Sequence, residues 1–411
     1  MRVVVVNSGS SSIKYKVFAL EDLTTLMEGL LERIGPGEAR LKHRRLTVSD
    51  DYEEIIETRF ITNHREGLEF ILDVAGRYPT TRDAPREFFG FGHRVVHGGE
   101  VFRKPVIIDD EAIRQIEDLI PLAPLHNPPN LVAIRALREL RPDVPNVAVF
   151  DTAFHQSMPP KAFHYALPSE FYRMHHVRRY GFHGSSHQYV AKEASRYLGI
   201  PEEQLNLITL HLGNGASASA LHGGKSIDTS MGLTPLEGLI MGTRCGDLDP
   251  AVHFYLSRKT GKSFEAIEDI LNKESGLKGI CGMNDMREIQ RCAEDGDDQA
   301  ELAIEMFCYR IKKYIGSYYA VLGRVDAIIF TGGIGENSAR VRKESCEGLT
   351  ALGISLDDHR NEEASFGVLE IQSEESRVKM LVIPTDEERE IALQTIHTIR
   401  HAAGVKGVPN L

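Results

Sequence analysis

The feature that most constrains the fold is a strand–turn–strand pattern that occurs twice, about 200 residues apart. The first copy has the β-branched run Val3–Val6, the turn residues Asn7–Ser12 and then alternating apolar and lysine positions over 13–17. The second copy has an apolar run at Leu207–Leu210 and a tight turn at Gly213–Gly215, followed by alternating small residues. Two such units in one chain predict a core domain that has been duplicated.

Segments with helical spacing alternate with short apolar runs elsewhere in the chain. Helices are predicted at 111–120, 130–141, 302–322 (with an interruption at Gly316) and 387–402, and strands at 144–150, 325–330 and 379–383. The proline-rich stretch 121–129 cannot form a helix interior. The glycine-rich stretch Gly332–Asn337 is interpreted as a turn. Strands that alternate with helices predict the α/β class.

Size and charge exclude several classes of protein. The chain has 411 residues, enough for two domains, and 59 acidic against 48 basic residues give a net charge of −11. This excess of negative charge argues against binding to nucleic acid. No stretch approaches the ~18 apolar residues of a membrane span, so we expect no membrane partner. Five cysteines without a CxxC pair, and a start that does not fit a signal peptide, predict a cytoplasmic protein with reduced thiols.

Three turns rich in glycine or serine follow predicted strands, at Asn7–Ser12, Gly213–Gly215 and Gly332–Asn337. Small residues allow backbone N–H groups to approach a phosphate closely, although each turn taken alone could be a plain tight turn. Three of them in one chain favour nucleotide phosphates. The Gly-Lys-Ser triplets at 224–226 and 261–263 lack the earlier glycine of a P-loop, and the protein-kinase and Rossmann signatures are absent.

Two arginines and two histidines stand out by their neighbours. Arg94 and Arg244 each lie among glycines and small residues, as expected for an anion clamp, while a solvated salt bridge is the plainer alternative. His183 and His187 have i,i+4 spacing without the HExxH motif. A structural role for these histidines is therefore favoured over a zinc site.

Two carboxylates lie at the ends of predicted elements. Asp151 closes an apolar strand, where a buried charge needs a partner. Glu387 begins a predicted helix, where capping is the plainer alternative. Either could hold Mg²⁺, which prefers one or two carboxylates together with phosphate oxygens.

Six segments along the chain resemble the acetokinase (acetate kinase) family, and they occur in the family's order. They are Asn7–Lys14, Gly92–Gly99, Phe150–His155, His211–Gly215, Phe330–Asn337 and Pro384–Glu388. The resemblance covers essentially the whole chain and implies the fold of the acetate and sugar kinase, Hsp70 and actin superfamily. That fold is α/β, with duplicated actin-like, ribonuclease H-like ATPase domains and an interdomain cleft. It implies an N-terminal domain of residues 1–150 plus about 385–411, for the acyl substrate and metal, and a nucleotide-binding domain of residues 151–384.

The resemblance also implies roles for individual residues. The implied catalytic residues are Asp151, Arg94, Arg244 and His183. The implied acyl-substrate site consists of Arg94, Val96, Leu125, Phe182 and Pro235. The implied ATP site consists of Lys14, His211, Leu212, Gly213, Asn214, Gly215, Asp285, Met286, Arg287, Gly333, Ile334, Gly335, Glu336 and Asn337. The implied metal ligands are Asn7 and Glu387. The segment Gly279–Arg287 is one residue shorter than the family pattern.

The activity that the resemblance implies is reversible phosphoryl transfer from ATP to acetate, giving acetyl phosphate and ADP, by a homodimer that uses Mg²⁺ or, alternatively, Mn²⁺. Acetate is already ionised near neutral pH, so Asp151 is expected to position Arg94 or a metal-bound water and not to act as a base. A propionate or butyrate kinase on the same scaffold is the alternative within the class. A non-catalytic ATP switch like Hsp70 or actin and a metal-dependent hydrolase are the alternatives outside it.

Overall fold

The computed structural model describes residues 1–411 except 36, 48–50, 78–86, 364–366 and 405–411. The chain forms two compact units. Unit 1 comprises Met1–Phe154 and Asp386–Leu411, and unit 2 comprises His155–Thr385. The sequence predicted an N-terminal domain of residues 1–150 plus about 385–411, which can be compared with unit 1. The last of these residues, 405–411, lie outside the described part of the chain.

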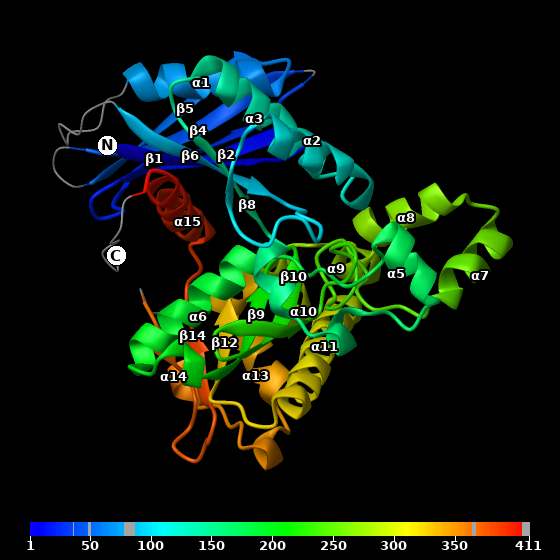
Figure 1. The fold of residues 1–411 in the computed structure, drawn as a ribbon. Coiled ribbons are helices and arrows are strands. Elements are labelled where there is room, and N and C mark those ends of the chain that lie inside the picture. Colours follow the sequence, from blue (N-terminus) through cyan, green and yellow to red (C-terminus); the bar gives the residue numbers. More distant parts are fainter. Residues whose placement is uncertain (36, 48–50, 78–86, 364–366, 405–411) are drawn as a thin grey trace. The chain divides into compact units, whose positions relative to one another are not determined.

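Unit 1 is built on an eight-stranded sheet with the order β5-β4-β3-β2-β1-β6-β8-β7 (Figure 1). The strands are β1 (Arg2–Ser8), β2 (Ser12–Ala19), β3 (Thr25–Glu32), β4 (Glu38–Leu46), β5 (Tyr52–Phe60), β6 (Phe88–Val95), β7 (Val106–Ile107) and β8 (Asn146–Phe150). Strand β1 pairs antiparallel with β2 and parallel with β6, which in turn pairs parallel with β8. The turn between β1 and β2 therefore lies at the sheet edge where β6 and β8 end.

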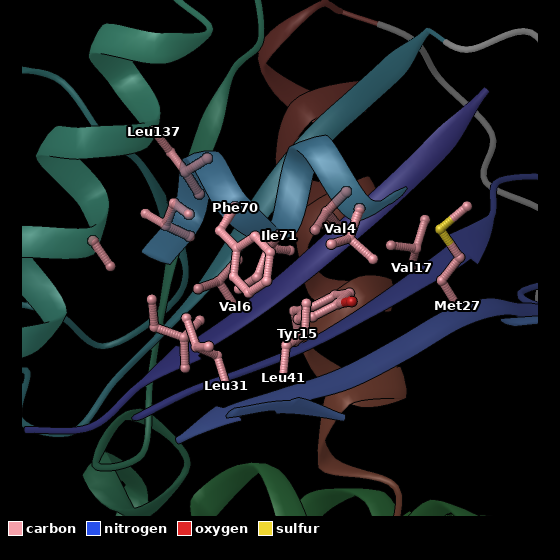
Figure 2. Close-up of a cluster of buried hydrophobic side chains, with 14 of the residues drawn as sticks. Val4, Val6, Tyr15, Val17, Met27, Leu31, Leu41, Phe70, Ile71 and Leu137 are labelled. Carbon is pink, nitrogen blue, oxygen red and sulfur yellow. The ribbon is translucent and has the colours of Figure 1, made fainter. Parts of the chain in front are cut away.

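Helices cover both faces of this sheet. They are α1 (His64–Arg77), α2 (Asp110–Asp118), the 3₁₀ helix η1 (Ile120–Leu122), α3 (Asn127–Leu140) and α15 (Glu387–Ala402). Val4 and Val6 pack with α1 and α3, in the cluster shown in Figure 2, whereas Val3 and Val5 pack with α15 on the other face. Because both faces of β1 are buried, Val3–Val6 is apolar throughout and does not alternate with polar residues.

Unit 2 is built on a six-stranded sheet with the order β11-β10-β9-β12-β14-β13. The strands are β9 (Asn206–Leu212), β10 (Ala216–His222), β11 (Lys225–Thr229), β12 (Ala327–Thr331), β13 (Leu369–Glu370) and β14 (Lys379–Val382). Its first five strands repeat the order β3-β2-β1-β6-β8 of unit 1, with two antiparallel pairings followed by two parallel ones. The duplication predicted from the sequence is therefore confirmed at the level of strand topology.

The helices of unit 2 connect and cover these strands (Figure 1). They are α4 (Pro160–Phe163), α5 (Ser169–His175), α6 (Gly184–Leu198), α7 (Ala251–Thr260), α8 (Phe264–Lys273), α9 (Gly276–Cys281), α10 (Met286–Glu294), α11 (Asp298–Leu322), α12 (Gly332–Asn337), α13 (Ala339–Cys346) and α14 (Asp358–Glu362), with the 3₁₀ helices η2 (Ala153–Ser157), η3 (Glu202–Gln204) and η4 (Thr350–Leu352). None of the helices in the described ranges combines the length and apolarity needed to cross a membrane.

Two elements differ from the sequence predictions. Helix α11 runs without a break through Gly316, because its buried stripe continues on both sides of that residue, with Ile315 before it and Tyr318 after it. The stretch Gly332–Asn337 is a short helix, not an open turn. Its first residue, Gly332, has φ +77°, and its backbone N–H donates to Glu336 Oε1 at 2.8 Å, which closes the helical turn.

Candidate active site

A buried ion pair lies where two parallel strands of unit 1 end. Arg94 is on β6 and Asp151 directly follows β8, and these strands are neighbours in register. Arg94 donates from Nε to Oδ1 of Asp151 at 2.9 Å and from Nη2 to Oδ2 at 2.6 Å. Asp151 is 1% exposed, so the fork from Arg94 compensates a carboxylate that would otherwise be costly to bury.

Glu387, in the first turn of α15, lies beside this pair, with its Oε2 3.9 Å from Arg94 Nε. Burial raises the pKa of Glu387, and the neighbouring carboxylates Asp151 and Glu388 raise it further against the opposing effect of Arg94. Burial opposes the charge of Arg94, but Asp151 and Glu387 outweigh burial and raise its pKa. The N-cap of α15 is Asp386, which accepts from Arg389 N at 3.1 Å, so capping is not the role of Glu387.

Asn7 and Lys14 face each other across β1 and β2 at the same edge. Lys14 Nζ lies 2.6 Å from Oε1 of Glu388, a residue that was not predicted from the sequence as part of the site. The adjacency of Glu388 to Glu387 in the Pro384–Glu388 motif was the available signal. The Lys14 ammonium, expected at ATP phosphates, is thus placed in the structure against the start of α15.

The residues around Glu387 fit a magnesium ion that is held mainly by other ligands. Within the described ranges, no group of three or more His, Cys, Asp or Glu residues is arranged to hold a metal. Mg²⁺ does not need such a cage, because it takes one or two carboxylates and completes its shell with water and phosphate oxygens. The Oγ of Ser8, next to Asn7, is buried and has no hydrogen-bond partner among the described residues. The side chains of Asn7, on β1, and Glu387, at the start of α15, both carry oxygen atoms of the kind that Mg²⁺ binds.

A second group of predicted residues lines a cavity of about 590 Å³ in unit 2, a volume that suits a nucleotide. The lining residues are Gly213, Asn214, Asn284, Asp285, Met286, Arg287, Gln290, Gly333, Ile334, Asn337 and Ser338. They come from the β9–β10 turn, the start of α10 and helix α12 after β12. Because β9 and β12 are parallel neighbours, their ends meet at one sheet edge. Asn284, Gln290 and Ser338 were not predicted from the sequence, although Asn284 adjoins the predicted Asp285 and Ser338 adjoins the predicted Asn337.

Several residues predicted for ATP act within the protein. Glu336 Oε1 accepts from the N–H groups of Gly332 and Thr385, at 2.8 and 3.0 Å. Asp285 caps α10 and accepts two hydrogen bonds from the side chain of Arg287. These bonds are the main reason that the pKa of Asp285 is lowered to about 2. Glu336 thus secures helix α12, and Asp285 secures helix α10. The remaining predicted residues outside the cavity lining are His211, Leu212, Gly215 and Gly335.

Arg244 and His183 approach each other at Gly215. A Cβ added to Gly215 would lie 3.4 Å from Arg244 Nη2 and 3.4 Å from His183 Nε2, so both side chains border the position that this glycine leaves open. Arg244 Nη1 donates to the carbonyl of Pro235 at 2.7 Å. His183 adopts the left-handed conformation at φ +57°, which is uncommon for a residue with a side chain and is found at functional sites.

The four residues predicted for an apolar acyl site are divided between the units. Val96 and Leu125 belong to unit 1, and Phe182 and Pro235 belong to unit 2. The N–H of Val96 donates to Asn130 Oδ1 at 3.2 Å. Phe182 is buried, whereas Leu125 is 55% exposed.

Comparisons with known proteins give one consistent family. The model of the acetokinase family matches residues 2–393. A curated relative named acetate kinase, from Syntrophobacter fumaroxidans, is 73% identical over 410 residues, which is 100% of both chains. The crystal structure of Porphyromonas gingivalis acetate kinase has a TM-score of 0.90 and 42% identity, and the match covers 97% of this chain and 99% of that one. A crystal structure described as a propionate kinase from Francisella tularensis also has a TM-score of 0.90, with 41% identity over 96% of this chain and 99% of that one.

Proposed function

Because this chain belongs to the acetokinase family over residues 2–393, we propose that it transfers the γ-phosphoryl group of ATP to acetate, reversibly, giving acetyl phosphate and ADP. The structural observation that carries this proposal is the buried fork between Arg94 and Asp151, beside Glu387. An arginine held in this way presents a fixed positive charge to an anionic acceptor. ATP would bind in the cavity of unit 2, between the glycine-rich turn and helix α12.

The chain's own residues supply charge and position, which is most of what phosphoryl transfer requires. Both oxygens of Asp151 accept from Arg94, so Asp151 orients the guanidinium and is not poised to remove a proton. Arg244 and His183, which both border Gly215, would bind oxygens of the transferring group. Asn7 and Glu387 would hold Mg²⁺, or Mn²⁺ in its place, and the ion would neutralise phosphate oxygens when bound.

We further propose that the enzyme is a cytoplasmic homodimer. All five cysteines are free thiols, which suits a reducing compartment. Unit 2 exposes large apolar side chains on α5, α7 and α8, among them Met174 (70% exposed), Tyr255 (55%) and Phe264 (61%). Exposed apolar side chains of this kind suit coverage by a second copy of the chain.

Propionate is the second candidate acceptor, because one structure of 41% identity is described as a propionate kinase. An apolar site distinguishes one methylene by only ~10–200-fold. The test measures ATP turnover with formate, acetate, propionate and butyrate, and traps the acyl phosphate with hydroxylamine. We expect acetate to be preferred, propionate to react more slowly and butyrate poorly. A preference for propionate would reassign the acceptor, and phosphate release without acyl hydroxamate would contradict the kinase proposal.

A further inference from the structure

Three buried polar side chains form a chain of hydrogen bonds behind His183. Ser217 Oγ, on β10, lies 2.9 Å from His183 Nδ1 and 2.8 Å from Nε2 of His187, on α6. His187 Nδ1 lies 2.7 Å from Oγ1 of Thr209, on β9. Ser217, His187 and Thr209 are all 0% exposed. The chain therefore runs from the interior of the sheet to His183.

His187 is neutral in this environment. Burial lowers its pKa well below the ordinary value, and the nearby His155 and His211 lower it further. A neutral imidazole has one N–H and one acceptor nitrogen. Since both nitrogens of His187 contact hydroxyl groups, one of those hydroxyls donates to His187 and the other accepts from it.

The hydroxyl hydrogen of Thr209 decides the direction. Among the described residues, the Thr209 hydroxyl has one hydrogen-bond contact, His187. If His187 donated to Thr209, the hydroxyl hydrogen would be buried without an acceptor, which is the costly arrangement. Thr209 therefore donates to His187 Nδ1, and His187 donates from Nε2 to Ser217. The hydroxyl of Ser217 then has His183 Nδ1 as its acceptor.

From this chain we propose that Thr209, His187 and Ser217 are positioning residues that hold His183 as its Nε2–H tautomer. The bond made by one ring nitrogen of a histidine determines the state of the other nitrogen. With Nδ1 accepting from Ser217, the proton of neutral His183 is on Nε2, the nitrogen that borders Gly215.

The consequence for the reaction rests on the proposed function. An Nε2–H group beside Arg244 donates a hydrogen bond to a phosphoryl oxygen, whereas the other tautomer would present a lone pair to that oxygen. The chain thus gives His183 the polarity that an anionic transition state requires. For His187, the i,i+4 spacing with His183 suggested either a zinc site or a purely structural role. Holding the tautomer of His183 is a different role from both.

The test combines a spectroscopic readout with kinetics on the full-length enzyme. The ¹⁵N resonances of His183 are assigned by their loss in His183→Gln and give its tautomer directly. Thr209→Val keeps the shape of the side chain and removes the deciding hydrogen, and Thr209→Ser restores it. Ser219→Ala is the matched control, because Ser219 is an equally buried serine of β10 whose hydroxyl donates to Thr229 instead.

We expect the wild type to show the Nε2–H form and Thr209→Val to show a mixture. The kcat of Thr209→Val should fall about 10-fold, while KM for ATP and acetate stays nearly unchanged. A loss of about 10-fold is the lower end of the effect on activity when a residue that orients a functional histidine through a hydrogen bond is replaced. Thr209→Ser should recover most of this loss, and Ser219→Ala should match the wild type in both readouts. Ser217→Ala, which removes the direct partner of His183, should have the larger kinetic effect.

An Nδ1–H tautomer in the wild type would overturn the proposal, and so would unchanged His183 resonances and kcat in Thr209→Val. A purely structural role would lower thermal stability without shifting the tautomer. The tautomer can be measured without turnover, so its result is separate from that of the acceptor assay. If that assay shows no acyl phosphate while His183 is in the Nε2–H form, the proposed function fails and the positioning chain stands.

Discussion

At the scale of single residues, the arrangement around Asp151 joins burial to charge compensation. The sequence indicated that a carboxylate closing an apolar strand needs a partner, and the structure provides one in Arg94, on the neighbouring strand. Glu387 adds a third charge to the group. What the sequence could not supply is geometry. The fork uses both Asp151 oxygens, a detail that favours a positioning role for this carboxylate over the role of a base.

Arg94→Lys should lower kcat/KM for acetate at least ~100-fold, because lysine keeps the charge but cannot form the two-bond fork. Steady-state kinetics with acetate varied measures this. Arg141→Lys is the matched control, since Arg141 donates to Asp143 through the same two nitrogens but at an exposed position. We expect that control to behave as the wild type. Near-normal turnover in Arg94→Lys would contradict a clamp role.

Asp151→Asn should also lose most activity, by at least ~100-fold, because the amide cannot accept the fork from Arg94 with both of its groups. Acetate has no proton to give up, so raising the pH should not restore the rate. The pH profile of kcat/KM between pH 6 and about 9 checks this. A rate that rises tenfold per pH unit would indicate that Asp151 acts as a base.

The adjacent residues Glu387 and Glu388 should affect stability in opposite directions. The pKa of Glu387 in the folded protein is raised above its ordinary value of 4.5. As the pH rises above 4.5, ionisation of Glu387 is therefore less favourable in the folded than in the unfolded protein, and the free energy of unfolding falls. This loss of stability persists at pH 7. Burial tends to raise the pKa of Glu388, but Lys14 outweighs burial and lowers it. The charge of Glu388 therefore stabilises the fold at neutral pH and that contribution is lost on acidification.

Thermal unfolding at pH 7 tests this pair. Glu387→Gln should raise Tm by about 2 °C, and Glu388→Gln should lower it by a similar amount. At a pH below the ordinary carboxyl pKa, both differences should shrink. Magnesium and ADP together should stabilise the wild type more than Glu387→Gln, because the variant loses a metal ligand. A lower Tm for Glu387→Gln at pH 7 would mean that the ionised Glu387 side chain stabilises the fold, contrary to the direction of its pKa shift.

At the scale of elements, the strands were easier to predict than the glycine-rich segments. The apolar runs that became β1, β9 and β12 are short and bounded by turn residues, so local pattern was sufficient. Gly332–Asn337 contains three glycines, which argue against a helix, yet it is α12. Its stability comes from the contacts of Glu336 with Gly332 and with Thr385, which is distant in sequence. Local propensity cannot indicate a tertiary contact of this kind.

Helix α12 should depend on the ability of Glu336 to accept these two bonds and not on its charge. Glu336→Gln keeps an accepting oxygen, and its KM for ATP should stay within about 3-fold of the wild type. Glu336→Ala leaves two N–H groups without their acceptor and should raise KM for ATP about 10-fold, the effect of about 1.4 kcal/mol. The KM for acetate should be unchanged in both variants. Equal damage from both substitutions would instead indicate that the carboxylate charge acts on the nucleotide.

At the scale of the whole molecule, duplication was visible in the sequence, but the assembly of each site was not. The two strand–turn–strand copies predicted two related sheets, and the shared strand order confirms this. Lys14 and Glu388 form an ion pair although they lie near opposite ends of the sequence, because the chain returns to unit 1 only in its last helix. The cavity of unit 2 likewise gathers three segments that follow different strands. Contacts between residues that are far apart in the sequence depend on the order and direction of the strands. The local periodicity of apolar residues carries no information about that order.

Unit 2 is continuous in sequence, so a chain of residues 155–385 should fold by itself and bind ADP without making acetyl phosphate. Both of its ends are tied into its own structure: His155 Nδ1 lies 2.8 Å from Ser226 Oγ, and Thr385 N donates to Glu336. All residues that line the 590 Å³ cavity belong to this unit.

Calorimetry should give this fragment an affinity for MgADP within about 10-fold of that of the full chain, because the fragment lacks the proposed metal ligands Asn7 and Glu387 but keeps every residue of the cavity lining. The matched control is the same fragment with Gly242→Ala. A Cβ at that position would lie 1.8 Å from Oδ1 of Asn214, which lines the cavity, so the Asn214 side chain must move and the affinity for MgADP should fall below that of the unmodified fragment. The fragment lacks Arg94 and Asp151 and should form no acyl hydroxamate. A fragment that unfolds cooperatively but does not bind ADP, while the full chain does, would show that the nucleotide site needs residues of unit 1.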